Sequence, residues 1–366
     1  MILPSRPKVW LIISILLLVS LSCNLVKPKS DTPSIAENLP NALNQIITSA
    51  TNEPGLNRKN PIPIGTQISV PGWQIKVLEF LRGEEARKIV DFSNSQDVTL
   101  DANWEYALAK VSVRCTSMDN YAHDLGISEL HMSGDKGLAY NDSMDGWPQP
   151  EFLFEDMFSA EIVEGWVDAV IPKDEHNIML VLDIWDDEFR TTRFFELEKN
   201  GSIQLSEELA NLNPNELGIN LDQPAPAGQL VITQDWEITV LNSLTGAEAN
   251  AALKTDNIYY APPGDGMEYL LVELKLRYIN TIDKPVWIGY DRFYGLDENG
   301  YMLEGDMIYT PNNKDWIEGN LLPGAELEGW VVLYILKGNE SPVMVFDPDR
   351  YESSDSKNNL RYLSVK

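Results

Sequence analysis

The sequence predicts an all-β chain in which two tandem antiparallel β-sandwiches follow an export signal and a tether. Three observations predict this arrangement: a long internal repeat, apolar residues at a period of two within each copy, and a short apolar leader that ends at a cysteine. A period of two is typical of half-buried strands, whose successive side chains point to opposite faces of a sheet. At 366 residues the chain is too long for one ordinary core and suits two domains.

The repeat is clearest at Trp73–Ala86, which returns as Trp236–Ala249 at an offset of 163 residues. Both segments begin with Trp-x-Ile-x-Val-Leu. Self-similarity at a fixed offset over this length indicates that one domain has been duplicated. Further matches, at the same offset or with a single-residue slip, pair Pro61–Gly65 with Pro224–Gly228, Glu105-Tyr106 with Glu268-Tyr269, Arg114 with Arg277, and Glu164–Val167 with Glu328–Val331.

The charge balance excludes one class of function. There are 56 acidic and 28 basic residues, which gives a net charge of -28. Such a surface repels phosphate backbones and therefore argues against nucleic-acid binding. The apolar content of 43% supplies enough material for a packed interior in each copy. With only Cys23 and Cys115, in very different settings, no disulfide framework is available.

Residues 1–23 have the pattern of a leader. Arg6 and Lys8 form a positive region, and Val9–Leu21 is a mostly apolar run of 13 residues that leads to Cys23. As a helix this run spans roughly 20 Å, short of the ~30 Å hydrocarbon core, so a permanent transmembrane span is disfavoured. A plain cleaved signal peptide and an uncleaved anchor are the alternative interpretations.

The end of the leader, Ser20–Cys23, resembles a bacterial lipobox, although Ser20 stands where leucine is usual. The resemblance implies that Cys23 becomes the first residue of the mature protein and carries the lipid that anchors it to a membrane. Stable attachment to a membrane needs at least two acyl chains, and the resemblance implies at least two on Cys23. Residues 24–60, rich in Pro, Ser, Asn, Thr and Lys, predict a flexible tether between lipid and first domain.

Each copy contains one long alternating strand, predicted from Ala107 to Cys115 and from Leu270 to Tyr278. The inward and outward sets coincide between the copies, so burial specifies the register. Earlier strands begin at Trp73 and Trp236. The remaining predicted elements are hairpin turns at Asp135–Gly137 and Asp297–Gly300, short helices at Glu84–Asp91 and Ala247–Lys254, and later strands from Trp330 to Leu336 and from Val343 to Phe346.

Several short strands separated by turn signals favour a sandwich of somewhat over 100 residues per copy. The boundaries that follow are a first sandwich at 61–198, a linker at 199–222 that is rich in Asn, Glu, Leu and Pro, and a second sandwich at 223–366.

The Trp-x-Ile-x-Val-Leu strand, the alternating strand opened by Glu-Tyr, and the Pro-Gly-x-x-x-Glu-Gly-Trp-Val strand together resemble a telokin-like, immunoglobulin-fold family of secreted bacterial domains. That family is common on lipoproteins and has no known function. The resemblance implies two immunoglobulin-like sandwiches and a location outside the cytoplasm, and it supplies no catalytic set. The first copy departs from the pattern because Ser159-Ala160 replaces Pro323-Gly324.

Three tryptophans are candidate ligand-binding residues. Trp147 and Trp316 are predicted in the loop before the Glu-Gly-Trp strand of each copy, and Trp185 precedes Asp186–Glu188. Aromatic rings beside carboxylates suit sugars or peptides, and the loops of sandwiches often carry function. The alternative is that these rings fold back onto the sandwich edges. The repeated Trp73, Trp166, Trp236 and Trp330 are expected in the core.

A calcium site is a second hypothesis. Asp297, Asn299 and Asp306 stand at positions that resemble a calcium loop, but its first aspartate is missing and predicted strands flank it. A hairpin turn with incidental acids is the alternative. The three histidines, His123, His131 and His176, have no metal-binding spacing, and Cys115 is expected in the core.

The function predicted from these features is a non-catalytic extracytoplasmic lipoprotein that binds or scaffolds an envelope protein or polysaccharide. The alternative is an accessory solute-capture or stress-related envelope protein with a ligand cleft between its domains. A carboxylate-based hydrolase is the third interpretation. The sequence shows no glycine-rich phosphate loop, Gly-x-Ser-x-Gly motif or Ser-His-Asp set.

Overall fold

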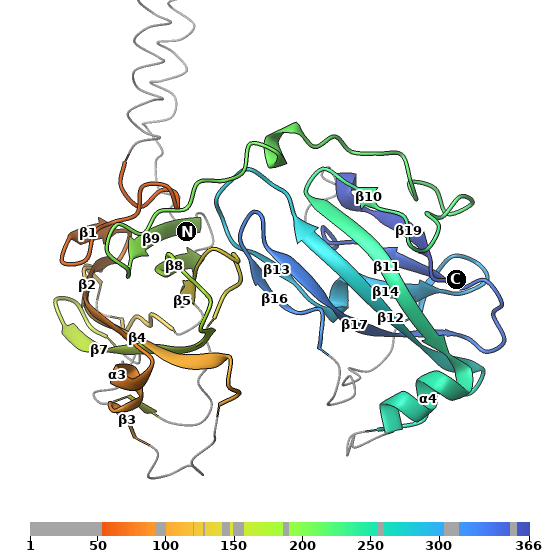
Figure 1. Cartoon of the computed structure of the whole chain (residues 1–366), viewed down its shortest axis with the longest axis horizontal. Coiled ribbons are helices and arrows are strands. Elements are labelled where there is room, and N and C mark those ends of the chain that lie inside the picture. The colour runs from red at the N-terminus through yellow and green to blue at the C-terminus, as the bar shows by residue number, and fades with distance from the viewer. Residues whose placement is uncertain are drawn as a thin grey trace, which may run out of the picture. The chain divides into compact units, whose positions relative to one another are not determined.

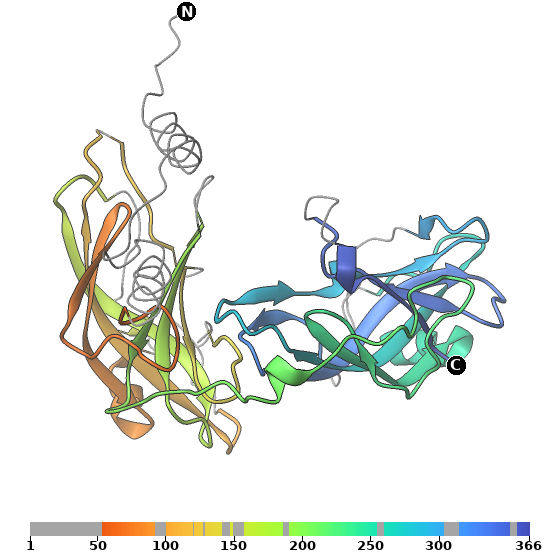
Figure 2. The same cartoon turned by 90° about the horizontal axis from the view of Figure 1, so that it is seen from above.

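A computed structural model gives the fold of the chain, shown from two sides in Figures 1 and 2. Asn52–Lys366 form one compact unit. None of the helices in the described residues has the length and apolar character needed to span a bilayer. Cys23 and most of the predicted tether lie outside the described residues, which are 53–91, 100–119, 121–126, 129–140, 147–148, 157–185, 190–254, 260–303, 315–351 and 357–366.

The first copy is a sandwich of antiparallel sheets. Its larger sheet has the strand order β1-β2-β4-β7, the facing sheet has the order β5-β8-β9, and β3 pairs with β6. The strands are β1 Gln67–Val70, β2 Trp73–Arg82, β3 Val90–Asp91, β4 Trp104–Cys115, β5 Leu130–Ser133, β6 Trp147–Pro148, β7 Ile162–Pro172, β8 Met179–Trp185 and β9 Arg190–Glu196.

The second copy repeats this plan. Its sheets have the orders β10-β11-β12-β17 and β15-β14-β18-β19, and β13 pairs with β16 (Figure 2). The strands are β10 Val231–Ile232, β11 Trp236–Thr245, β12 Met267–Tyr278, β13 Val286–Ile288, β14 Phe293–Leu296, β15 Met302–Leu303, β16 Gly319–Leu321, β17 Glu326–Leu336, β18 Val343–Phe346 and β19 Arg361–Ser364. The short 3-10 helices are η2 Leu209–Asn211, η3 Tyr290–Arg292 and η4 Lys357–Asn359.

The duplication extends to irregularities of the backbone. The register between β2 and β4 shifts between Val77 and Glu79, and that between β11 and β12 shifts at the equivalent Val240 and Asn242. Two predominantly antiparallel sandwiches with the same bulge confirm the predicted fold class. Trp73 and Trp236 lie in the two separate interior clusters, and Cys115 is buried in the first, as predicted.

The turns and helices follow the predictions with one correction. Asp297–Gly300 forms the hairpin turn between β14 and β15, and α4 spans Gly246–Lys254. However, α3 covers only Glu84–Arg87, because Val90–Asp91 leaves the helix to pair with β6. The helix predicted for Glu84–Asp91 is therefore too long by one turn.

The predicted alternation holds only along part of each long strand. Leu108 on β4 and Leu271 on β12 belong to the outward sets of the predicted alternation, yet both are buried. The neighbouring Tyr106 and Tyr269 are buried as well. They form an outer cluster in each copy, with α3 covering the first and α4 the second (Figure 1). At this end of each strand both faces are apolar, so a helix must cover the face that the sandwich core leaves open.

A buried ion pair joins the segment before the first copy to the second copy. Arg58 is 1% exposed, and its Nε donates to Asp283 Oδ1 over 2.7 Å while Nη2 donates to the Pro323 carbonyl. Its backbone N–H donates to the other carboxylate oxygen of Asp283. The tether predicted for residues 24–60 is therefore too long at its C-terminal end, because residues 53–60 fold against the sandwiches.

Backbone pairing and apolar contacts extend this junction. Leu138 of the first copy forms an antiparallel bridge with Leu321, and the Leu322 N–H donates to the Gly137 carbonyl over 2.8 Å. Leu322 is buried in a cluster with Met179, Val181 and Phe194, which lie on the face of β8 and β9 turned away from the first interior cluster. Most of the groups that form this junction are buried.

The predicted linker is attached at both ends. The Ile203 N–H donates to the Arg58 carbonyl, and the Tyr362 N–H donates to the Gly218 carbonyl. The chain between the two copies therefore follows their surfaces.

The first prediction concerns the ion pair at the junction. Replacing Arg58 or Asp283 singly by alanine should lower the free energy of unfolding by roughly 3–5 kcal/mol, because each change leaves a buried charge without its partner. The double alanine variant should lose less than the sum of the two single losses. Urea unfolding of the four proteins measures this coupling, and strictly additive losses would contradict a direct buried pair.

The second prediction concerns His131, which is 2% exposed on β5 and whose Nε2 has no hydrogen-bond partner among the described residues. Burial lowers the pKa of His131 to about 4; Asp183 raises it and Arg190 lowers it. The imidazole is therefore neutral in the folded protein, while the unfolded chain binds a proton below a pKa of roughly 6.5. Stability should fall as the pH drops from that value towards 4.

By pH 5 this histidine should cost the wild type roughly 2 kcal/mol relative to pH 7. Urea unfolding of wild type and His131→Phe at both pH values isolates the contribution from that of the carboxylates. A variant that loses as much stability as the wild type on acidification would sink the assignment.

Candidate ligand-binding pocket

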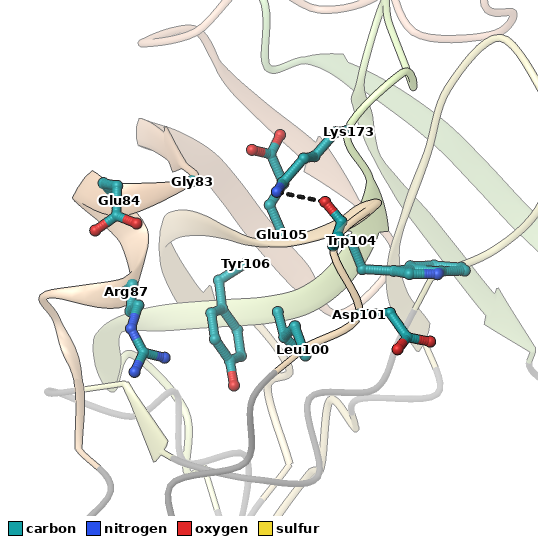
Figure 3. A pocket seen from close by; sticks show the side chains of 10 residues that line it. Gly83, Glu84, Arg87, Leu100, Asp101, Trp104, Glu105, Tyr106 and Lys173 are labelled. Carbon is teal, nitrogen blue, oxygen red and sulfur yellow. Dashed lines mark hydrogen bonds between the residues drawn. The ribbon is translucent and has the colours of Figure 1, made fainter.

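Described residues of the first copy line an open cavity of about 460 Å³ beside α3. Figure 3 shows it from close by: Arg87 comes from the helix and Tyr106 from β4, and their side chains extend to the same side. A pocket of this size suits a small ligand or one side chain of a larger partner. Its lining consists of Gly83, Glu84, Arg87, Leu100, Asp101, Ala102, Trp104, Glu105, Tyr106 and Lys173.

Gly83 sets the direction of the helix that forms one wall. Its φ of 62° lies in the left-handed region, which glycine adopts at little cost. Its N–H donates to the Tyr106 carbonyl over 2.8 Å, which ties the start of α3 to β4. A Cβ at this position would approach the Glu105 carboxylate to 3.0 Å. The turn therefore brings Glu84 and Arg87 to the edge of the central strand.

A network of charges fixes one side of the pocket. Arg82 Nε donates to Glu105 Oε1 over 2.6 Å, and Nη1 of the same residue donates to Glu198. Burial lowers the pKa of Arg82, but the hydrogen bonds to Glu105 and Glu198 outweigh it and raise that pKa above its ordinary value. Lys173 Nζ donates to the Ala102 carbonyl over 2.6 Å. Glu105 and Lys173 are thus engaged within the protein.

The other side of the pocket is apolar. Tyr106 is buried, Leu100 is half-buried, and Trp104 is 38% exposed at the rim. The Trp104 ring meets Tyr140 edge-on, with 6.4 Å between the ring centroids. Tyr140 in turn donates its hydroxyl to Glu175 over 2.8 Å, and burial followed by the Glu175 charge raises the pKa of Tyr140. The tryptophan is therefore packed against a tyrosine that is itself held in place.

The equivalent place in the second copy contains a side chain of the protein itself. The ring of Tyr260 lies 6.4 Å from that of Tyr269, which is the equivalent of Tyr106. The Tyr260 hydroxyl donates to Asn250 Oδ1 over 3.3 Å, and Asn250 is the equivalent of Arg87. The second copy thus places a tyrosine ring between two residues whose counterparts line the pocket of the first.

Of the predicted ligand-binding tryptophans, Trp185 is 70% exposed. Its Nε1 donates to Asp183 over 3.0 Å, and the Arg190 guanidinium lies 4.1 Å from its ring centroid. Arg190 also donates to the Pro285 carbonyl of the second copy. Burial raises the pKa of Asp183, but the hydrogen bonds from Arg190 outweigh it and hold that pKa below its ordinary value. Trp185 therefore presents a fixed ring beside the junction.

The other two tryptophans have different surroundings. Trp316 is half-buried, and its segment is held on β17 because the Trp330 N–H donates to the Asp315 carbonyl. A Cβ on Gly329 would collide with this segment, so glycine permits the close approach. Trp147 pairs through its backbone with Asp91, and its side chain lies outside the described residues. Neither Trp185 nor Trp316 is among the described residues that line the pocket.

The calcium hypothesis is tested only in part. The Asp297 carboxylate accepts hydrogen bonds from the N–H groups of Asn299 and Tyr301, each over 2.8 Å. These backbone hydrogen bonds, Tyr301 first, lower the pKa of Asp297. Asp306 lies outside the described residues, within which no group of three acidic, histidine or cysteine side chains could hold a metal ion. Asp297 therefore serves its own hairpin turn.

Sequence reasoning missed the residues of the pocket, above all Trp104 and Arg87. One signal was present: at the offset of the repeat, Trp104 matches Met267 and Arg87 matches Asn250. A tryptophan and an arginine that are not shared between the copies are not needed for the common core. Differences between duplicated copies, rather than their identities, mark this site.

Comparisons with known proteins concern only the fold. No protein-family model matches the chain, and no curated protein matches it. The crystal structure of the yjhA protein from Bacillus subtilis is similar to part of it, with 17% identity, a TM-score of 0.26, and coverage of 37% of this chain and 99% of that chain. A crystal structure of an uncharacterized β-sandwich protein from Clostridium difficile 630 gives 13% identity, a TM-score of 0.23, and coverage of 40% and 100%.

Proposed function

We propose that this chain is a non-catalytic binding module, displayed outside the cytoplasm by a lipid on Cys23, that holds an envelope protein or polysaccharide in the pocket of its first copy. The observation that carries the proposal is the contrast between the copies. The first has a cavity of about 460 Å³ between Arg87, Trp104 and Tyr106, whereas the second has Tyr260 packed at the corresponding place. This difference between duplicated copies favours a binding role at the pocket of the first.

The side chains of the pocket favour binding over hydrolysis. Glu105 is paired with Arg82, and Glu84 and Asp101 are exposed to solvent. An aromatic rim, an apolar wall and a few oriented polar groups instead fit the usual composition of a ligand pocket.

The junction favours this site over a ligand cleft between the copies, which is the alternative function. The ion pair of Arg58 with Asp283, the bridge between Leu138 and Leu321, and the apolar contacts of Leu322 fill the contact region with protein groups. A hinge that opened there would expose a buried charge pair, and uncovering such groups is costly. The pocket beside α3 requires no such opening.

The proposed location rests on the sequence. The Ser20–Cys23 lipobox resemblance supports a lipid on Cys23, and the residues up to 52 that follow would serve as a tether before the first folded residues. Two acyl chains would keep the module on the membrane while leaving the pocket accessible.

The third prediction tests the binding role in cells. A photo-cross-linking amino acid at Glu84, on the pocket wall, should capture a partner when the native host cells are irradiated. The matched control is the same amino acid at Ala247, the exposed equivalent on α4. Adducts are measured by mass spectrometry and glycan staining.

Capture at position 84 but not at 247 is the expected outcome. Equal capture at both positions, or at neither, would count against a binding site in the first copy. A Cys23→Ser version should move from the membrane to the soluble fraction, and its retention on the membrane would remove the lipid anchor from the proposal.

A further inference from the structure

Within the chain, a turn of the second copy docks on the first copy. The turn consists of residues 321–325, and we call it the docking turn. Its Leu322 is 1% exposed because it packs on the outer face of β8 and β9. The Leu322 N–H donates to the carbonyl of Gly137, in the hairpin turn after β5. This hairpin turn and the outer face of β8 and β9 together form the docking face of the first copy.

The first copy has a docking turn of its own, at residues 157–161. Its backbone hydrogen bonds to the end of β4 repeat those of residues 321–325 to the end of β12. Phe158 stands at the position of Leu322 and is 53% exposed. Its N–H, the counterpart of the one that crosses the junction, donates to the side chain of Glu161 over 3.1 Å. The first copy therefore presents an apolar docking turn to solvent.

The second copy has the counterpart of the docking face. The pairing of β18 with β19 repeats that of β8 with β9, so Val343 and Tyr362 lie where the first copy receives Leu322. Both side chains are half-buried. Leu221, which stands at the position of Arg58 in the repeat, is 40% exposed. This face therefore offers apolar side chains at the places that the junction buries in the first copy.

The two hairpin glycines show the difference between the faces. A Cβ on Gly137 would lie 3.2 Å from the Ala325 Cβ and 3.3 Å from the Leu322 carbonyl oxygen, both in the docking turn. Gly300 is the counterpart of Gly137, with φ of 80° against 69°. Among the described residues, only Leu221 comes within 4 Å of a Cβ built there. In the described part of the chain, no turn is docked at Gly300.

The exposed turn of the first copy and the open face of the second match each other in a second molecule. We propose that copies of this chain associate head to tail, with the docking turn 157–161 of one molecule on the second copy of the next. Such an interface is heterologous, so its repetition builds a row of molecules unless the rotation closes a ring. This self-association goes beyond the proposed binding function and does not use the pocket beside α3.

The interface between molecules is more apolar than the junction inside the chain. Leu221 replaces the arginine of the buried ion pair, and the ring of Phe158 adds apolar area that association removes from water. On docking, the Phe158 N–H exchanges the exposed Glu161 carboxylate for the Gly300 carbonyl. The net charge of -28 makes the molecules repel one another. Salt screens that repulsion and should therefore strengthen the association.

Cysteine cross-linking of two full-length variants in detergent tests the head-to-tail geometry. Inside the chain the Pro323 carbonyl accepts a hydrogen bond from Arg58 Nη2 over 2.7 Å. Their counterparts, Ser159 and Leu221, should therefore meet between molecules. A mixture of Ser159→Cys and Leu221→Cys chains should form a disulfide-linked dimer on mild oxidation, and neither variant alone should. The matched control replaces Leu221→Cys by Leu241→Cys, a leucine of similar exposure on β11.

Sedimentation velocity of the same full-length protein measures the association itself. The average mass of the wild type should rise with protein concentration and with salt. Phe158→Glu should weaken the association at least tenfold, because it places a charge in an apolar interface. Phe158→Leu is the matched variant and should retain the association, because leucine is the residue that the chain uses at its own junction. The side chain at 158 is exposed, so both variants should fold.

Two sets of results would overturn the inference. The first is a wild type that stays monomeric at every concentration and salt level, with no cross-link above the Leu241→Cys control. The second is association that persists in Phe158→Glu, or a cross-link between two Ser159→Cys chains, because either would indicate a different interface. Capture of a partner at position 84 in cells does not depend on this interface, so the proposed function is tested separately.

Discussion

Each copy is organised around a central strand that is apolar on both faces at one end. Along β4 and β12 the inner face packs into the sandwich, and the outer face at the Tyr106 and Tyr269 end needs a separate cover. Leaving this apolar face exposed to water would cost roughly 25 cal/mol of folding free energy for every square ångström. The helix that follows the Trp strand supplies that cover: α3 after β2 in the first copy and α4 after β11 in the second. A cavity lies beside this cover in the first copy, whereas Tyr260 packs against Tyr269 at the corresponding place in the second.

The same constraint explains the junction between the copies. The strand β8 has a continuous apolar run, Met179–Leu182, so its two faces cannot both point into one core. Leu180 and Leu182 enter the first interior cluster, while Met179 and Val181 pack against Leu322 of the second copy. The second copy therefore acts as the cover for this sheet. Buried polar groups here, Arg58 with Asp283 above all, are satisfied by partners across the junction.

The sequence was sufficient for the fold because the duplication supplied two readings of the same pattern. Several elements agree with the prediction: the strands that begin at Trp73 and Trp236, the helix α4, and the hairpin turn at Asp297–Gly300. The pattern misjudged Leu108 and Leu271, because periodicity alone does not reveal which sheet face a helix covers. The junction could not be predicted either, since an arginine in a polar stretch carries no mark of burial. Arg58 was assigned to the tether for that reason.

The site was harder to predict than the fold. The sequence favours Trp147, Trp185 and Trp316 as aromatics in loops, whereas the tryptophan among the described lining residues is Trp104, at the start of a strand. The internal repeat draws attention to the residues that the two copies share, whereas this pocket arises from residues that they do not share. Comparing Arg87 with Asn250 and Asp97 with Tyr260 would have indicated the place, though not its depth or its walls.

The central claim is that the outer face of the central strand is filled from within the second copy and left for a ligand in the first. The most direct measurement is the free energy of unfolding of a variant that copies the closed arrangement into the first copy, with Asp97→Tyr and Arg87→Asn together. The account predicts a rise of roughly 1 kcal/mol over the wild type, from a new buried aromatic contact with Tyr106. A fall, or no change, would show that a tyrosine has no place there.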